Sequence, residues 1–333
     1  MRKILFSLFI VCLFCKAEAQ DPHFSQFFAS PLTLNPALTG KFDGDLRVTG
    51  NYRNQWPSIN RAFVTTTAAI DFPILRNSVA ANDTWGVGVT GFSDQSANSA
   101  LKFNYLSVST AFHKGLDEDG YQQIGAGFQA TYTNMMLDGT KLTFEDQLTP
   151  LGFTGSTSEV LKQSEMSNSY IDLNAGALYT GSTTDRNNFY AGISMYHITR
   201  PKQSFTNTFF LLNPRTTFHA GGYFPVNDMT TVHLSGLYST QAKASEAVLG
   251  GAAQFTVAEG EKVTSVYVGS WYRFNDAIIP YIGLEFADFR LGATYDVNTS
   301  SLKTASQSQG GIEISLVYIK RTPGSKGLPC PKF

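Results

Sequence analysis

The chain has 333 residues and a formal net charge of −1, with 15% charged and 13% aromatic residues. A near-neutral chain lacks the basic surface that nucleic-acid binding needs, so that class of partner is excluded. After residues 1–19, no run of the sequence approaches the roughly eighteen consecutive apolar residues of a membrane-spanning helix. A membrane protein without such helices has one other solution, a closed β-barrel, because every backbone polar group must find a partner within the chain.

Residues 1–19 have the three parts of a cleavable secretory signal. They are a positive start at Arg2 and Lys3, an apolar run over residues 4–14, and small residues at Ala17 and Ala19. The cysteines near its end do not follow the small residue that a lipoprotein signal needs. The sequence therefore predicts an exported chain without a lipid anchor, beginning at Gln20 after cleavage.

Residues 20–44 are predicted to form an extended arm and not a regular strand or helix. Pro22, Pro31 and Pro36 fix their own φ angles and push the preceding residues out of the helical region. Its aromatic residues, which a disordered linker would lack, are Phe24, Phe27 and Phe28. We expect this arm to pack against the periplasmic end of a barrel or inside its lumen.

A barrel sequence shows segments of about ten residues that alternate in polarity between turn residues. Fourteen such segments predict an all-β, transmembrane antiparallel barrel over residues 45–320. In the last segment Ile312 and Ile314 share one face, and Glu313 and Ser315 the other. A soluble exported β-sandwich gives the same alternation and stays open as an alternative. The segments are 45–56, 61–72, 84–94, 101–113, 121–133, 169–180, 188–197, 215–225, 231–240, 246–258, 264–274, 278–287, 289–297 and 310–320.

Aromatic residues stand at many segment ends, as expected at the headgroup level of a bilayer, where a ring is half buried and half wet. They are Trp56, Trp85, Phe112, Tyr179, Tyr196, Phe224, Tyr238, Phe274 and Tyr318. With both termini in the periplasm, the long connections 134–168 and 198–214 are external loops, and most periplasmic turns are short. Two long external loops are suited to a protein partner.

Charged residues occupy strand ends or the faces opposite the apolar ones, so they are expected to point into the lumen. They are Arg47, Arg53, Arg61, Arg273 and Arg290, with Asp172, Glu285, Asp296 and Glu313. Such charges either line a water-filled pore or pair with one another and close it. Because both signs are represented, pairing is favoured. A porin-like diffusion channel is the alternative.

Patterns that carry chemistry in other proteins have simpler interpretations here. Gly86-x-Gly88-x-x-Gly91 has the letters of a dinucleotide fingerprint but lies inside a strand pattern, where glycines make room for bulky neighbours in the lumen. The acidic run 117–119 lacks calcium-loop spacing, and the five histidines lack metal-ligand spacing. No Gly-x-Ser-x-Gly elbow or local Ser/His pair supplies a nucleophile. The sequence therefore predicts no enzyme, no cofactor and no metal site.

Residues 321–333 form a short C-terminal tail that cannot join the sheet, because prolines and glycines recur in it. The tail ends in Cys330-Pro331-Lys332-Phe333. The other two cysteines leave with the signal, so Cys330 has no intramolecular partner. A buried periplasmic anchor is the favoured interpretation of this tail, and a reactive or intermolecular thiol is the alternative.

Four motifs near the two ends of the mature chain stand out together. They are Gln20-Asp21-Pro22-x-Phe24-Ser25-Gln26-Phe27, Leu34-Asn35-Pro36-Ala37 with Gly40, Asn51-Tyr52-Arg53-x-Gln55-Trp56, and the closing Cys330-Pro331-Lys332-Phe333. Together they resemble the PorP/SprF family of outer-membrane β-barrels associated with the type IX secretion system and gliding motility. The middle segments match only in general barrel character. These motif residues are therefore the candidates for family-specific interactions.

The resemblance implies a non-enzymatic protein of the outer membrane. PorP-like members connect this membrane and its lipids to periplasmic components of the secretion machine, including a peptidoglycan-binding lipoprotein. SprF-like members are needed for secretion or surface attachment of large adhesins that carry a particular type of C-terminal signal domain. The adhesin-partner role is the first hypothesis for this chain.

Overall fold

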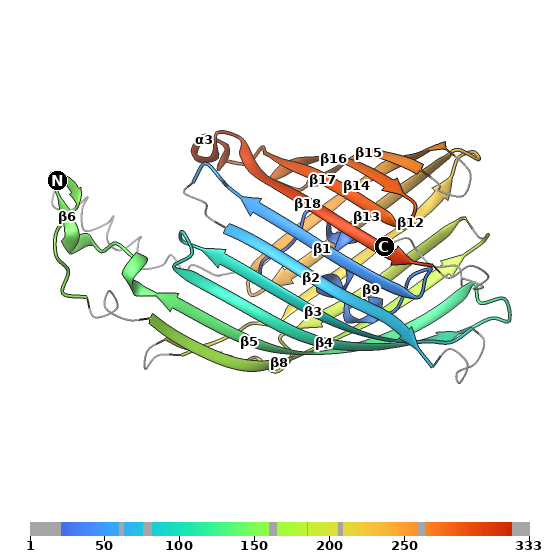
Figure 1. The fold of residues 1–333 in the computed structure, drawn as a ribbon, viewed down its shortest axis with the longest axis horizontal. Helices are drawn as coiled ribbons and strands as arrows, with labels where there is room; N and C mark the ends of the chain where they lie inside the picture. Colours follow the sequence, from blue (N-terminus) through green and yellow to red (C-terminus); the bar gives the residue numbers. More distant parts are fainter. Residues whose placement is uncertain are drawn as a thin grey trace.

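The structure, a computed structural model, describes residues 21–59, 63–75, 82–159, 165–184, 186–205, 209–258 and 264–321. Within them fourteen antiparallel strands close into a single barrel, in the order β1-β18-β17-β16-β15-β14-β13-β12-β9-β8-β5-β4-β3-β2 (Figure 1). The predicted all-β barrel of fourteen strands is therefore confirmed. The predicted leader 1–19, Gln20, Arg61 and residues 322–333 of the tail, with Cys330, Pro331 and Phe333, lie outside the described residues.

Each predicted segment overlaps one strand of the wall. The strands are β1 (Leu46–Gln55), β2 (Phe63–Ile74), β3 (Thr84–Ser96), β4 (Leu101–Gly115), β5 (Gln122–Asp138), β8 (Glu165–Ser182), β9 (Asn188–Tyr196), β12 (Arg215–Pro225), β13 (Thr230–Gln241), β14 (Ala244–Ala258), β15 (Thr264–Arg273), β16 (Ala277–Phe286), β17 (Phe289–Asn298) and β18 (Gln309–Lys320). Only β5 and β8 run well past their predicted ends, because their pairing continues through 134–138 and 165–168, where consecutive apolar residues such as Met135 and Met136 break the alternation.

The wall forms because each strand places apolar side chains outside and polar ones inside. On β18, Ile312 and Ile314 are exposed on the outer face, whereas Glu313 and Ser315 are buried in the lumen. The last strand pairs with the first over ten residues, with Arg53 opposite Glu313, and this pairing closes the sheet. A closed sheet leaves no free strand edge along the apolar belt, as a bilayer requires. No helix in the described ranges has the length and apolarity needed to cross a membrane.

The two ends of the barrel differ. At one, which we call the long-loop end, the β5–β8 connection projects from the wall in Figure 1, and β10 of the β9–β12 connection lies beside β8. The elements in these connections are η3 (Gly139–Lys141), η4 (Glu145–Gln147), β6 (Leu148–Thr149), β7 (Gly152–Phe153), β10 (Lys202–Gln203) and β11 (Phe210–Leu211), and α3 (Lys303–Ser306) precedes β18 at the same end. Opposite lies the short-turn end, where tight connections such as 226–229 join the strands and where β18 ends.

Residues 21–45, which we call the arm, fill the interior of the barrel (Figure 1). They contain three short helical turns, η1 (Phe27–Ala29), α2 (Pro31–Leu34) and η2 (Pro36–Leu38), each limited in length by the prolines that start or interrupt them. The backbone N–H of Asp21 donates to Gln241 at the long-loop end, and that of Asp45 donates to the carbonyl of Lys320 at the short-turn end. The arm therefore passes along the lumen before the chain enters β1.

Candidate functional site

Small residues on the inner wall let the arm approach the strands closely. A Cβ atom at Gly86 would collide with the carbonyl oxygen of Thr39, and one at Gly88 would lie 3.0 Å from a methyl carbon of Leu32. The wall glycines that face the arm in this way are Gly86, Gly88, Gly127, Gly176, Gly192 and Gly292. Two glycines of the dinucleotide-like pattern thus have a packing role, as predicted from their place inside a strand.

Asn35 attaches the middle of the arm to the wall. Its side-chain oxygen caps η2 by accepting the N–H of Ala37 at 2.8 Å. Its side-chain nitrogen donates to the carbonyl oxygens of Ala177 and Ile193, at 3.1 and 3.2 Å, and lies 3.0 Å from Nε2 of His219. Because Asn35 is completely buried, these bonds satisfy a polar group that would otherwise be costly. One residue of the Leu-Asn-Pro-Ala motif therefore joins the arm to β8, β9 and β12.

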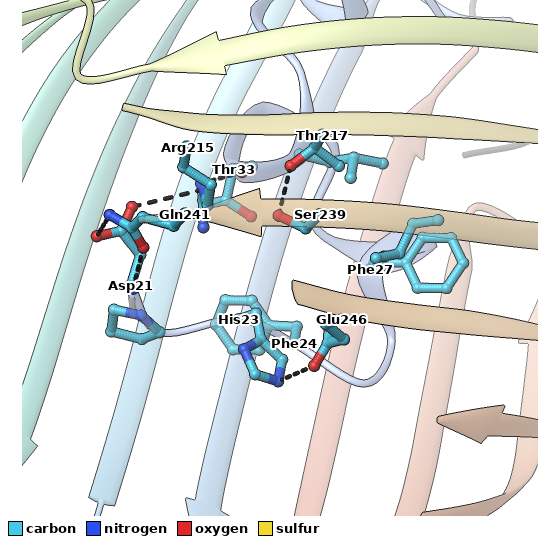
Figure 2. A pocket seen from close by; sticks show the side chains of 13 residues that line it. Asp21, His23, Phe24, Phe27, Thr33, Arg215, Thr217, Ser239, Gln241 and Glu246 are labelled. Atoms are coloured by element: carbon cyan, nitrogen blue, oxygen red, sulfur yellow. Dashed lines mark hydrogen bonds and ion pairs between the residues drawn. The ribbon is translucent and has the colours of Figure 1, made fainter. Parts of the chain in front are cut away.

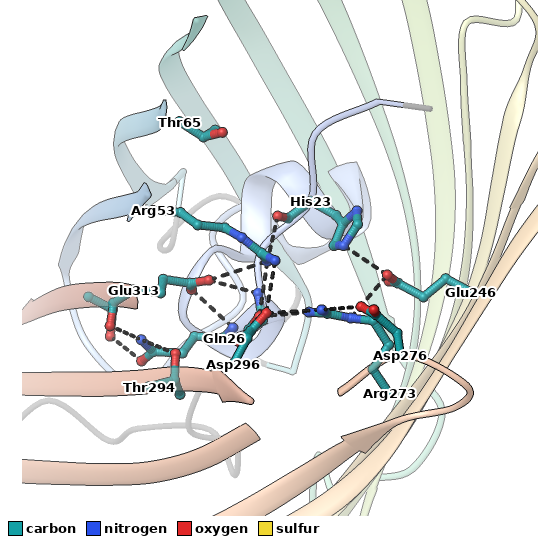
Figure 3. A network of polar contacts seen from close by, with 12 residues as sticks. His23, Gln26, Arg53, Thr65, Glu246, Arg273, Asp276, Thr294, Asp296 and Glu313 are labelled. Atoms are coloured by element: carbon teal, nitrogen blue, oxygen red, sulfur yellow. Dashed lines mark hydrogen bonds and ion pairs between the residues drawn. The ribbon is translucent and has the colours of Figure 1, made fainter. Parts of the chain in front are cut away.

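The start of η1 binds a buried carboxylate pair (Figure 3). The backbone N–H groups of Ser25 and Gln26 donate to the two carboxylate oxygens of Glu313, at 2.7 and 3.0 Å. The hydroxyl of Ser25 donates to Asp296 at 2.8 Å. Arg53 contributes a guanidinium that lies 3.0 Å from Asp296 and 3.7 Å from Glu313. The Ser-Gln and Asn-Tyr-Arg motifs, far apart in the sequence, thus meet at one site.

Arg273 completes this network from the opposite side in Figure 3. Its guanidinium lies 2.9 Å from Asp296 and 3.2 Å from Glu246, and it donates to the Ser25 hydroxyl at 2.7 Å. Glu246 also lies 2.8 Å from Nε2 of His23 on the arm. Two arginines therefore share the buried acids of this network with the arm, and the charges of the two signs pair with one another.

A second polar cluster holds the first residue of the arm at the long-loop end. A carboxylate oxygen of Asp21 lies 2.6 Å from Nε2 of His197, whose Nδ1 lies 2.6 Å from Asp172. Gln241 donates to Asp21 at 3.0 Å, and Arg215 lies 3.5 Å from it (Figure 2). The end of the arm is thereby fixed to β8, β12, β13 and the residue that follows β9.

The charges of this cluster stabilise one another. Burial disfavours the imidazolium form of His197, but the carboxylates of Asp21 and Asp172 outweigh it and raise the pKa of His197 to about 9. Burial likewise opposes ionisation of Asp21, yet His197 and Arg215 hold the pKa of its carboxyl well below the usual range. An imidazolium between two carboxylates is therefore the expected state at neutral pH.

At the short-turn end the arm is held by another buried ion pair. Arg47 binds Asp71 through two nitrogens, at 2.9 and 2.8 Å, and also donates to the carbonyl of Leu38. The N–H of Gly40 donates to the same Asp71 carboxylate at 2.7 Å, and the ammonium of Lys41 contacts Gln123. Gly40 adopts a φ of 71°, which glycine tolerates without strain. The arm is thus bound to the wall at both ends and in the middle.

Aromatic packing fills the lumen between these polar clusters. The ring of Phe28 stacks on Trp271 with centroids 4.6 Å apart, and it meets Tyr281 and His233 edge-on. The cavities at the long-loop end, on either side of Asp21, have volumes of about 50 and 70 Å³. Spaces of this size hold a few water molecules but give no wide passage.

The predicted pairing of lumen charges is confirmed for the described residues. Arg47, Arg53, Arg273 and Arg290 each have an acidic partner, which for Arg290 is Glu285 at 3.3 Å. The predicted acid Asp172 pairs with His197 and not with an arginine. The pairs form because the inward phase of neighbouring strands places their side chains at the same level of the lumen.

The structure brings together most of the predicted site residues. Those that lie in the arm or line the lumen are Asp21, Pro22, Phe24, Ser25, Gln26, Phe27, Asn35, Pro36, Gly40, Asn51 and Arg53. Tyr52 points outward from β1 and is 41% exposed, and the ring of Trp56 packs against that of Phe63 just beyond the partly exposed Gln55. In the part of this motif that lies on β1, therefore, only alternate residues face the lumen.

Tyr196 is a correction to the predicted ring of interfacial aromatics. It is buried in the lumen, donates its hydroxyl to the carbonyl of Leu32 at 3.1 Å, and stacks under the guanidinium of Arg215. The predicted position of Tyr196 at the end of a strand is confirmed, but its side chain points into the lumen. Trp85, Phe112, Phe224, Tyr238 and Phe274 do lie exposed on the outer face.

Several residues of the site were not singled out from the sequence. They are His197, Arg215, Gln241, Glu246 and Trp271. For Arg215, Gln241, Glu246 and Trp271 the inward phase of β12 to β15 was the available signal, but phase gives no partner across the lumen. In the part of the chain that the structure describes, no group of three His, Cys, Asp or Glu side chains is placed to hold a metal ion.

Solved structures with similar folds are outer-membrane barrels of low sequence identity. The Ralstonia pickettii toluene transporter TbuX has a TM-score of 0.50 and 12% identity, with 88% of this chain and 93% of that one covered. The deltaS2S3 mutant of the monoaromatic hydrocarbon channel TodX has a TM-score of 0.50 and 10% identity, with 87% and 94% covered. At such identities the likeness concerns the fold alone.

The family comparison covers nearly the whole chain. A comparison with curated proteins found no significant match. The profile of the family described as "Type IX secretion system membrane protein PorP/SprF" matches residues 16–318, which include the arm and the wall except its last residues. The chain is an outer-membrane β-barrel that belongs to the PorP/SprF family of type IX secretion system membrane proteins.

Proposed function

We propose that this protein is a non-enzymatic, plugged component of the type IX secretion machinery that supports secretion or surface attachment of a large adhesin, and with it gliding motility. The observation that carries the proposal is the occupied lumen. The arm is held by Asp21 at the long-loop end, Asn35 in the middle and Gly40 at the short-turn end. A barrel built around such a core is a rigid scaffold for protein partners.

The porin-like alternative finds less support in the same contacts. Solute diffusion needs a continuous water path, and here buried ion pairs such as Arg53–Asp296 and stacked rings such as Phe28–Trp271 occupy the interior. Removing the arm would expose these charges and rings together. The plug therefore favours a scaffold over a steady diffusion channel.

The two ends of the barrel suit different partners. We place the long-loop end outside the cell, where the projecting β5–β8 connection, with exposed Leu148, Leu151 and Phe153, offers surface to a secreted adhesin. The short-turn end then faces the periplasm, where secretion-machine components such as a peptidoglycan-binding lipoprotein would bind. Exposed apolar residues on the outer face of the strands contact outer-membrane lipids.

Planar-bilayer recording tests the plugged state. We expect the purified protein to insert without a steady open current, whereas a general porin in the same bilayer conducts throughout. A large, steady open current from the intact protein would contradict the scaffold and favour the channel.

Deletion of the gene tests the secretion role. We expect type IX secreted adhesins to be lost from the cell surface and to return when the intact gene is restored. If every surface adhesin remains secreted and attached after the deletion, the proposed function is wrong.

A further inference from the structure

The long-loop half of β8 has a strand neighbour on one side only. β5 pairs with β8 along its whole length, whereas β9 pairs only with Ala175 to Ser182. The carbonyl of Leu173 still accepts the N–H of Ile198, at 3.1 Å. Beyond it, no strand among the described ranges pairs with this side of β8. A strand edge is therefore open at the rim of the barrel.

The open edge consists of the backbone groups of Ser167, Ser169 and Ile171. In an antiparallel ladder, alternate residues direct both their N–H and C=O to the same side. The carbonyl of Leu173 faces the β9 side, so the odd-numbered residues before it face that side too. The even-numbered residues between them face β5. Three donors and three acceptors are thus presented in a row, which is about the length of an ordinary strand.

This edge begins at the headgroup-level margin of the apolar belt, where Ile171 lies opposite Tyr132, and extends above it. The outward side chains of Leu173 and Ile171 are exposed and apolar, whereas those of Ser169 and Ser167 are polar. The outward Tyr132 donates its hydroxyl to Ser169 Oγ at 3.0 Å, as a tyrosine at the headgroup level would. The open backbone groups therefore face water, where an unpaired edge is tolerated and accessible.

The edge residues themselves include none of the types that usually protect a strand edge. Residues 166–171 contain no lysine, proline or glycine. The β9–β12 connection approaches the edge, but the contact is a side-chain bond, in which Gln203 donates to the hydroxyl of Tyr170 at 2.9 Å. It leaves the backbone groups of Ser167, Ser169 and Ile171 unpaired in the described structure. An edge that has no charged residue or proline of its own is suited to pairing with another chain.

We propose that the edge from Ser167 to Ile171 binds an extended segment of the secreted partner by strand addition. This deepens the proposed function and rests on it. Main-chain hydrogen bonds supply affinity in this mode, and alternate side chains supply selectivity. Because Ser167 and Ser169 are small hydroxyl residues, the matching segment is uncharged and rich in Ser, Thr and β-branched residues.

Residue-resolved hydrogen exchange on the intact barrel in detergent tests the edge directly. Without ligand, the amides of Ser167, Ser169 and Ile171 should exchange faster than those of Asn168 and Tyr170, which face β5. A capped nine-residue peptide of alternating Thr and Val should slow the three edge amides about tenfold, and a control peptide with proline in place of threonine should not. Equal slow exchange at all five positions, or no response to the Thr-Val peptide, overturns the proposal.

Complementation of the deletion strain tests the edge in cells. Ser167→Pro removes an edge donor without touching the ladder to β5, and Ser167→Ala keeps it. With both variants shown to be folded by heat-modifiable gel mobility, we expect surface adhesin to fall about tenfold with Ser167→Pro and to stay normal with Ser167→Ala. Normal surface adhesin with Ser167→Pro would contradict strand addition at this edge and leave the proposed secretion function standing.

Failure of the proposed secretion function would be recognised separately, because deletion of the gene would then leave surface adhesin unchanged. If Ser167→Pro does not fold, the exchange experiment on the intact barrel decides.

Discussion

The guanidinium of Arg53 lies 3.0 Å from the carboxylate of Asp296, and this buried pair joins β1 to β17 across the intervening β18. The Ser25 hydroxyl donates to the same carboxylate, so the arm is part of the connection. The pair therefore stabilises the closure of the barrel and the position of the arm together.

Replacing Arg53 with methionine should destabilise the barrel strongly. The change leaves Glu313 without a cationic partner in the lumen, and breaking one side of a buried pair costs about 3–5 kcal/mol. The free energy of unfolding, measured in detergent, reports the loss. The matched control is Arg186→Met, because the Arg186–Asp228 pair is exposed and should contribute less than about 1 kcal/mol. Equal effects of the two changes would argue against a structural role for Arg53.

Gly86→Ala should displace the arm from β3. The added methyl group would collide with the carbonyl oxygen of Thr39, which is backbone and cannot rotate away. Overpacking of this kind costs about 1–3 kcal/mol. Gly50→Ala is the control, since the nearest atom to its new Cβ would be 3.8 Å away. Thermal midpoints of the two variants compare them, and an unchanged midpoint for Gly86→Ala would show that the arm can shift without cost.

Phe28→Ala should loosen the centre of the plug. Loss of a buried phenylalanine costs about 3–5 kcal/mol, and water would reach the indole of Trp271 on which its ring stacks. In a Trp56→Phe, Trp85→Phe background the emission of Trp271 should shift to the red. Phe128→Ala, on the outer face where Phe128 is 64% exposed, should leave that emission unchanged. A blue or unchanged spectrum for Phe28→Ala would mean that this stacking does not shield Trp271.

The end of the arm should be released at alkaline pH. Because the pKa of His197 is raised from 6.5 to about 9, its contribution is fully present below pH 6.5 and is lost as pH rises through 9. The pKa of Asp21 is lowered, so its contribution is present above pH 3.8 and is lost at more acidic pH. A spin label at Pro22→Cys, in a background with Cys12, Cys15 and Cys330 replaced by serine, should be immobile at pH 6 and mobile near pH 10.

The control for this pH response is His197→Asn. Without the imidazolium, the label should be mobile at both pH values. Label mobility that still switched between pH 6 and 10 in this variant would assign the transition to another group.

Much of the wall could be predicted from the sequence because its signal is local. Each strand repeats polar and apolar residues with period two, and this pattern found all fourteen strands. Boundaries failed where the pattern stopped before the pairing did. β5 and β8 continue through 134–138 and 165–168, where the alternation is lost, so the open edge of β8 could not be foreseen.

The position of the arm could be predicted only in part from the sequence. Its prolines and phenylalanines predicted an ordered, non-strand segment, and the same phase rule predicted paired charges in the lumen. The partners of His197 and Trp271 could not be predicted, because Asp21 and Phe28 reach them across the interior and no local pattern records such distances. Tyr196 illustrates the same limit, since at a strand end a shift of one residue turns an outward ring inward.

By itself, therefore, the sequence determined the barrel, its strand number and the residues able to face inward, because these follow from short-range periodicity. Only the tertiary structure decided that the arm runs through the lumen from Asp21 to Asp45, that Arg53 meets Asp296, and that β8 keeps an open edge. These features depend on closure of the sheet, which brings together side chains and backbone groups that are distant along the chain.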